Sequence, residues 1–227
     1  MSKKKKGKKG RKEAFDPEKD TGILRPVDMT IAAGEINDRY SDYPSRGLNP
    51  VKLASILRDA DEGNVRSQME LFEEMEEKDA HLFSQMQTRK LAVTGLDWEV
   101  QPFSPDDEQD KAIAEWIKDQ LLGIENLDDI LTDLLDAIGK GVSIMEIIWG
   151  VDSDGFNVIE DIRYVHQKKL VWDWETDDML VCTEQFPNGI HLPKNKFVVH
   201  RYKAKSGHPS RAGIMRIVSW MYLFKNY

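Results

Sequence analysis

The apolar and polar residues between positions 49 and 141 repeat mostly with the period of an α-helix. This pattern predicts four helices, over residues 49–63, 64–95, 104–123 and 126–138. The first has an asparagine suited to capping at its start, followed by a proline, and a glycine at its end. Residues 96–103 instead alternate between apolar and polar side chains, which predicts one half-buried strand.

The pattern changes to that of β-strands from Val142 to about Lys203. Apolar segments flank two short polar stretches, residues 152–155 and 175–178, which predicts two hairpins. The segment KFVVHRYK, residues 196–203, predicts a further strand. Helices followed by strands and by a closing helix indicate an α+β fold, in which helices pack on a small, mainly antiparallel sheet.

The last segment, residues 207–227, predicts a helix from Ser210 onward, because its apolar residues fall at helical spacing. No glycine, asparagine or proline follows to end that helix. We therefore expect it to begin a long helix that leads to further regions of a longer protein. The residues expected to pack against those regions, or against another subunit, are Ile214, Ile217, Met221 and Phe224.

The N-terminus is strongly basic, whereas the rest of the chain is acidic. Residues 1–12 hold eight basic side chains and no acid, which leaves 24 basic against 40 acidic residues, a net charge of −16, in the remainder. A lysine block of this kind cannot bury apolar surface and is predicted to be disordered. It can serve solubility alone, or it can contact nucleic acid or an acidic partner through Lys3, Lys4, Lys5, Lys6, Lys8, Lys9, Arg11 and Lys12.

Three parts of the chain follow from these patterns. Residues 1–48 are predicted to form a disordered basic tail and an extended arm, since residues 13–48 show neither the helical nor the strand period of apolar residues. Residues 49–206 form an α+β domain, and residues 207–227 begin the long helix. No apolar run approaches the roughly 18 residues that suggest a membrane span, so we expect a soluble protein without a membrane partner. The single cysteine, Cys182, excludes an intramolecular disulfide.

The candidate catalytic and metal-binding motifs are incomplete. The stretch GKGVS at residues 139–143 lacks the full phosphate-loop pattern and follows a helix, the wrong order for that motif. The acidic residues at 152–155 lack the closing glutamate of a calcium loop, and those at 173–178 lack a partner at catalytic spacing. The five histidines form no i, i+4 pair, and no G-x-S-x-G turn is present. We expect no cofactor, no metal and no enzymatic activity.

Three long blocks carry a resemblance to a known family: DAHLFSQMQTRKLAVTGLDWEVQP (79–102), IGKGVSIMEIIW (138–149) and GHPSRAGIMRIVSWMYLFKNY (207–227). Together they resemble the portal proteins of Mu-like tailed bacteriophages, in order from about residue 26 to residue 227. The resemblance implies a portal wing region, part of the ring at one vertex of the phage head through which DNA is packaged and ejected.

The resemblance also implies partners and a location. The partners would be other portal subunits, the terminase motor, capsid and head-completion proteins, and DNA passing through the channel. The protein would lie in the host bacterial cytoplasm during assembly and at the head vertex of the virion. Known members are longer, so the expected product is a truncated portal subunit. The alternative is a standalone nucleic-acid-binding or scaffold-binding module that uses the lysine-rich tail.

Overall fold

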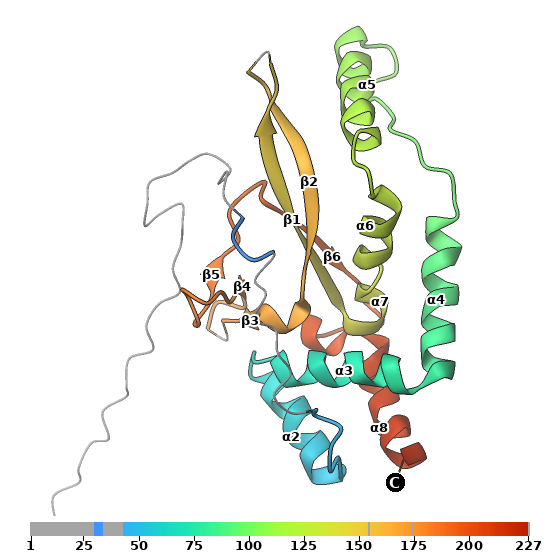
Figure 1. Cartoon of the computed structure of the whole chain (residues 1–227), viewed down its shortest axis with the longest axis vertical. Helices are drawn as coiled ribbons and strands as arrows, with labels where there is room; N and C mark the ends of the chain where they lie inside the picture. The colour runs from blue at the N-terminus through green and yellow to red at the C-terminus, as the bar shows by residue number, and fades with distance from the viewer. Residues whose placement is uncertain (1–29, 34–42, 154, 174, 227) are drawn as a thin grey trace, which may run out of the picture.

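A long antiparallel hairpin forms the centre of the molecule (Figure 1). The computed structural model describes residues 30–33, 43–153, 155–173 and 175–226. Strand β1 (Val142–Val151) pairs with β2 (Asn157–Val165) on one side and with β6 (Phe197–Arg201) on the other. The side chain of Asp152 closes the hairpin turn by accepting the backbone N–H of Phe156 at 2.8 Å. The hairpin predicted around residues 152–155 is confirmed.

A second three-stranded sheet in the described part of the chain holds the other predicted hairpin. Strands β3 (Leu170–Trp172) and β4 (Met179–Val181) are antiparallel, and β5 (Ile190–His191) pairs with β4. The short 3₁₀ helix η1 (Gln167–Lys169) joins β2 to β3. The predicted strands therefore divide between two sheets. Strand β5 was not predicted, because two residues are too few to show a period of two.

The predicted helix 64–95 is two helices, α3 (Arg66–Lys78) and α4 (Ala80–Thr94), which run in different directions (Figure 1). Asp79 separates them with an extended backbone, and its side chain accepts the N–H groups of His81 and Leu82 at 3.1 and 3.3 Å. Apolar spacing continues across this break, so periodicity alone indicated a single helix. The capping aspartate was the local signal for the second start.

The strand predicted over residues 96–103 does not form. This segment is irregular and has no partner strand, and Leu96 and Phe103 are 66% and 98% exposed. The helix predicted from residue 104 is α5 (Glu108–Leu122), which begins later because Asp107, not Ser104, caps it by accepting the N–H of Gln109 at 2.8 Å. An alternating pattern forms a strand only when another strand supplies hydrogen bonds.

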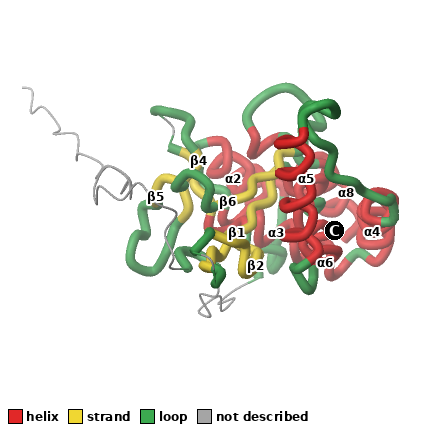
Figure 2. The backbone as a smooth tube through the Cα atoms, turned by 90° about the horizontal axis from the view of Figure 1, so that it is seen from above, coloured by secondary structure: helices red, strands yellow, loops and turns green. Residues whose placement is uncertain are grey.

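The helix predicted over residues 126–138 ends early and restarts as a single turn. Helix α6 (Leu127–Leu134) packs on one face of the central hairpin, and α7 (Ala137–Lys140) leads directly into β1. The view from above places the α4–α6 helices on one side of β1 and β2, and the β4–β5 hairpin on the other (Figure 2). Gly141, with φ +93°, makes the change from helix to strand.

The last helix, α8 (Ile214–Asn226), follows the 3₁₀ helix η2 (Pro209–Arg211) and shares the main core with α2 (Pro50–Asp61) and α3. Met215, Tyr222 and Leu223 are its buried apolar residues. The chain enters α8 through a close backbone crossing, since a Cβ atom on Gly213 would lie 2.2 Å from the carbonyl oxygen of Gly139. A glycine is therefore required there, and the crossing fixes α8 beside α7.

None of the helices in the described ranges is long and apolar enough to cross a membrane. The basic tail and most of the predicted arm lie outside the described residues. Two pieces of the predicted arm are described, and both contact the body. Residues 43–48 form a turn, in which Ser45 donates its backbone N–H to Glu74 at 2.7 Å. Ala32 and Ala33 are buried.

Candidate functional site

Helix α8 presents an apolar face to solvent. Ile217, Met221 and Phe224 are 59%, 65% and 66% exposed, and their spacing places them on one side of the helix. Ile214, which was expected on the same face, instead packs against the main core. Among the four predicted packing residues, three are thus available for a further contact and one is already used within the described chain.

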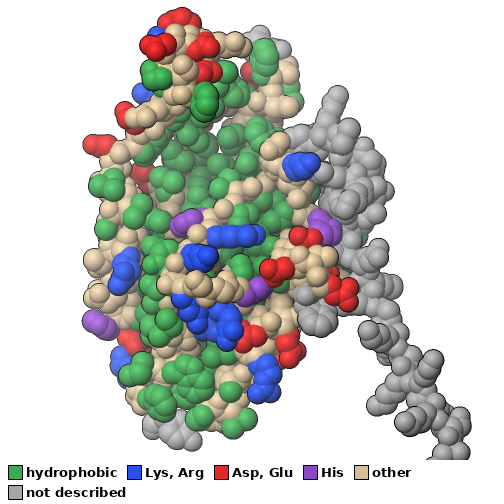
Figure 3. All heavy atoms as spheres, turned by 180° about the vertical axis from the view of Figure 1, so that it is seen from behind, with side chains coloured by type: hydrophobic (Ala, Val, Ile, Leu, Met, Phe, Trp, Pro, Cys, Tyr) green, Lys and Arg blue, Asp and Glu red, His purple; other side chains and the backbone are tan. Residues whose placement is uncertain are grey.

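Further exposed apolar side chains occur along the chain from the end of α4 through the irregular segment to α5. The apolar side chains of α5 fall at helical spacing, but Ile113, Trp116 and Ile117 are 48%, 47% and 38% exposed, whereas Leu121 packs against the body. The exposed apolar side chains from the end of α4 to α5 are called the upper apolar surface below. Besides the three exposed residues of α5 just named, its members are Leu91, Val93, Leu96, Trp98, Phe103 and Leu122. Apolar side chains are also seen in the upper part of the rear face of the molecule (Figure 3).

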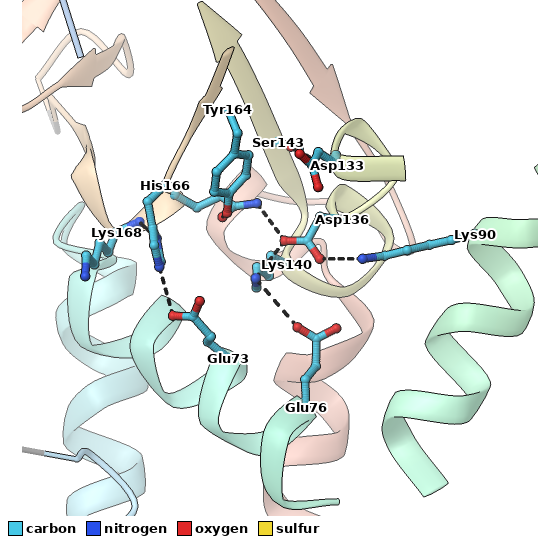
Figure 4. Close-up of polar contacts among 11 residues, drawn as sticks. Glu73, Glu76, Lys90, Asp133, Asp136, Lys140, Ser143, Tyr164, His166 and Lys168 are labelled. Carbon is cyan, nitrogen blue, oxygen red and sulfur yellow. Dashed lines mark hydrogen bonds and ion pairs between the residues drawn. The ribbon is translucent and has the colours of Figure 1, made fainter. Parts of the chain in front are cut away.

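A buried charge cluster lies where α3, α4 and α7 meet the end of β2 (Figure 4). Asp136, just before α7, accepts hydrogen bonds from Lys140 at 2.6 Å, from Lys90 of α4 at 2.9 Å and from Gln167 of η1 at 2.9 Å. Lys140 also lies 3.6 Å from Glu76 of α3. All four charged side chains are less than a fifth exposed.

The charges in this cluster change one another's ionisation. Burial alone would raise the pKa of Asp136, but the positive charges of Lys140 and Lys90 outweigh it and lower that pKa to about 2. Burial alone would lower the pKa of Lys140, but Asp136 above all holds it above its ordinary value. Burial raises the pKa of Glu76, against the opposing effect of Lys140. Asp136 and Lys140 therefore stay ionised at neutral pH.

Neighbouring polar groups extend the cluster toward the sheets. Tyr164 donates its hydroxyl to the Gln167 side chain, and burial raises the pKa of that hydroxyl. His166 lies 2.8 Å from Glu73 of α3. The carboxylate of Asp136 already accepts three hydrogen bonds, from three different elements. We therefore interpret the cluster as a structural contact, or joint, between these elements and not as a reactive site. Sequence reasoning missed it, although Asp136 and Lys140 stand at i, i+4 spacing, which was a visible signal.

One arrangement superficially resembles a catalytic triad. His208 lies 3.1 Å from Asp177 through Nε2, and its Nδ1 lies 2.7 Å from the hydroxyl of Ser210. Ser210 is 1% exposed, so its hydroxyl cannot reach a substrate. His208 also caps the turn of η2 by accepting the backbone N–H of Ser210, which is an ordinary structural role. No group of three or more metal-ligating side chains occurs within the described ranges.

Comparison with known proteins identifies the family. The sequence profile described as "Portal protein of Mu bacteriophage" matches residues 69–227, which include both described sheets and α8. The chain belongs to this family. This match confirms the resemblance inferred from the three sequence blocks.

Two relatives support the assignment. The chain is 37% identical over 194 residues to the Haemophilus influenzae protein named "Mu-like prophage FluMu protein gp29". The aligned region covers 83% of this chain and 36% of that protein. The chain is also 32% identical over 191 residues to the "Portal protein" of Escherichia phage Mu, covering 83% of this chain and 37% of the relative. The chain thus spans a little over a third of the length of these relatives.

Proposed function

We propose that the chain acts as a structural subunit of a phage portal and corresponds to the N-terminal part of that subunit. The observation that carries the proposal is the match to the portal family over residues 69–227. The expected partners are other portal subunits, the terminase motor, capsid and head-completion proteins, and DNA in the channel. The expected location is the head vertex of the virion.

The described surface supports this role. A ring closes by heterologous contacts, in which one surface of a subunit meets a different surface of the next. The upper apolar surface offers one such surface, whereas the exposed face of α8 is left for the regions of the relatives that have no counterpart in this chain. Helices α5 and α8 lie at opposite ends of the molecule (Figure 1). Large exposed apolar patches mark sites of protein contact.

We further propose that the chain has no catalytic turnover, and that ATP is consumed by a partner motor.

Labelling of phage particles tests the portal role. The gene is tagged in its own place in the phage or prophage genome, so that any sequence that continues it is kept, and the particles formed after induction are labelled with a gold-conjugated antibody. We expect one labelled vertex per head, because a portal occupies a single vertex. A matched control carries the same tag on a coat protein, which should label the whole head. Label on every face of the head, or normal DNA-filled particles after deletion of the gene, would contradict the proposal.

The alternative proposal is a nucleic-acid-binding or scaffold-binding module that works through the lysine-rich tail. Eight basic side chains in residues 1–12 favour it. Basic side chains that neutralise phosphates release the counterions of the nucleic acid, and this release favours binding most at low salt. Deleting residues 2–12 separates the two proposals. A portal subunit should keep its fold and its subunit contacts, whereas a module should lose its partner. Duplex-DNA binding, circular dichroism and particle assembly are compared for the two proteins: loss of both DNA binding and particle assembly with an unchanged fold favours the module, and an unchanged fold with normal particle assembly favours the portal subunit.

A further inference from the structure

A carboxylate in the middle of the central sheet binds the main chain of a distant segment. Glu146 of β1 accepts the backbone N–H groups of Ile31, Ala32 and Ala33, at 2.5, 2.8 and 2.8 Å. Its side chain is 0% exposed. Three successive amides directed at one carboxylate form an anion-binding arrangement, here closed by a group of the protein itself.

Two lysines complete the arrangement. The ammonium group of Lys196, also 0% exposed, lies 3.4 Å from Glu146, and within the described chain it has no hydrogen-bond partner. Lys169 donates a hydrogen bond to the carbonyl oxygen of Ala32 at 2.9 Å. The methyl groups of Ala32 and Ala33 are buried, at 0% and 6% exposure, so larger side chains would have to displace core atoms. The arrangement therefore selects a segment with small side chains and free N–H groups.

We propose that Glu146, Lys196 and Lys169 form a docking site for the main chain of residues 31–33, which tethers the N-terminal segment to the body. If the segment leaves, Lys196 stays beside Glu146 as a counter-charge, so that release would not leave Glu146 as an unpaired buried charge. This inference does not depend on the portal role, since it rests on contacts within one chain.

Docking limits how far the lysine-rich block can reach. Lys12 precedes Ile31 by 19 residues, which span at most about 65 Å when fully extended. Without docking, the first described contact is that of the Lys78 ammonium group with the ring of Tyr43, and the same block could reach about 105 Å from it. Release of residues 31–33 would therefore extend by more than half the range over which the basic side chains find a partner.

Amide hydrogen exchange of the full chain, followed residue by residue by NMR, tests the docking. In the unchanged protein the amides of Ile31, Ala32 and Ala33 should exchange at least about tenfold more slowly than in a free peptide, because each donates to a buried charge. The variant Ala32→Pro removes one of these donors without changing any residue of the body. It should return Ile31 and Ala33 to the free-peptide rate while the amides of β1 stay protected.

Two further variants make the result decisive. Ala32→Gly keeps the N–H group and should retain the protection, so it is the matched control. The double variant E146L/K196M removes both buried charges together and should release the segment while the body stays folded. Free-peptide exchange at residues 31–33 in the unchanged protein would overturn the docking site. Equal protection in Ala32→Pro and the unchanged protein would overturn it as well, whatever the double variant does to β1.

Discussion

Replacing Asp136 by alanine is expected to destabilise the folded chain by about 3–5 kcal/mol, because it leaves two buried lysines without their carboxylate. Lys90 and Lys140 are both about nine-tenths buried or more, and both donate to Asp136. Domains of this size are stable by only about 5–15 kcal/mol, so this loss removes much of the total. Urea unfolding followed by tryptophan fluorescence measures the change.

The matched control is Glu108→Ala. Glu108 and Lys111 form an ion pair of similar length, 2.6 Å, but their side chains are 86% and 46% exposed. Exposed pairs contribute less than about 1 kcal/mol. If Asp136→Ala and Glu108→Ala lower the free energy of unfolding equally, the buried cluster is not the joint between α4, α7 and η1 that its geometry indicates.

The same variant has a defined pH dependence. The pKa of Asp136 is lowered from its ordinary value to about 2 in the folded chain. A carboxyl group with a lowered pKa stabilises the fold fully above its unfolded pKa, near 4, and this contribution is lost as the pH falls through the folded value. The stability difference between the unchanged protein and Asp136→Ala should therefore be constant above about pH 5 and shrink between about pH 4 and pH 2.

Features fixed by local interactions could be predicted from the sequence. The Asn49 cap forms as expected, accepting the N–H of Lys52 at 2.9 Å, and both hairpins lie around their polar turns. Failures occurred where the outcome depended on distant partners. Residues 96–103 alternate correctly for a strand but lie beside no other strand in the described chain, so no hydrogen-bond partner is present for them.

The buried polar sites were hidden for a similar reason. Asp136 and Lys140 are near in sequence, but Lys90 and Gln167 come from elements 46 and 31 residues away from Asp136. Glu146 gave a clearer signal, since it stands between Ile144 and Ile148 at positions of β1 that face the core. A charged residue at a core-facing position requires partners. Their identity depends on a fold that brings Ile31 and Lys196 to the same strand.

The isolated chain is expected to aggregate through α8 as its concentration rises, without forming a closed ring. Ile217, Met221 and Phe224 expose an apolar face, and each large apolar side chain left exposed forgoes roughly 1.5–3 kcal/mol of burial. About two thirds of each relative has no counterpart in this chain. In the portal proposal those regions supply both the cover for this face and part of the contacts that close a ring.

Light scattering after size-exclusion chromatography, over a range of concentrations, decides this prediction. The triple variant I217S/M221S/F224S should remain monomeric where the unchanged chain scatters strongly, because it removes the apolar face while leaving Met215 and Leu223 in the core. The control V51S/V151S changes two exposed valines of α2 and β1, outside α8, and should aggregate like the unchanged chain. A monodisperse closed ring formed by the unchanged chain would show that these 227 residues suffice for assembly, and that the exposed face of α8 needs no further region to cover it.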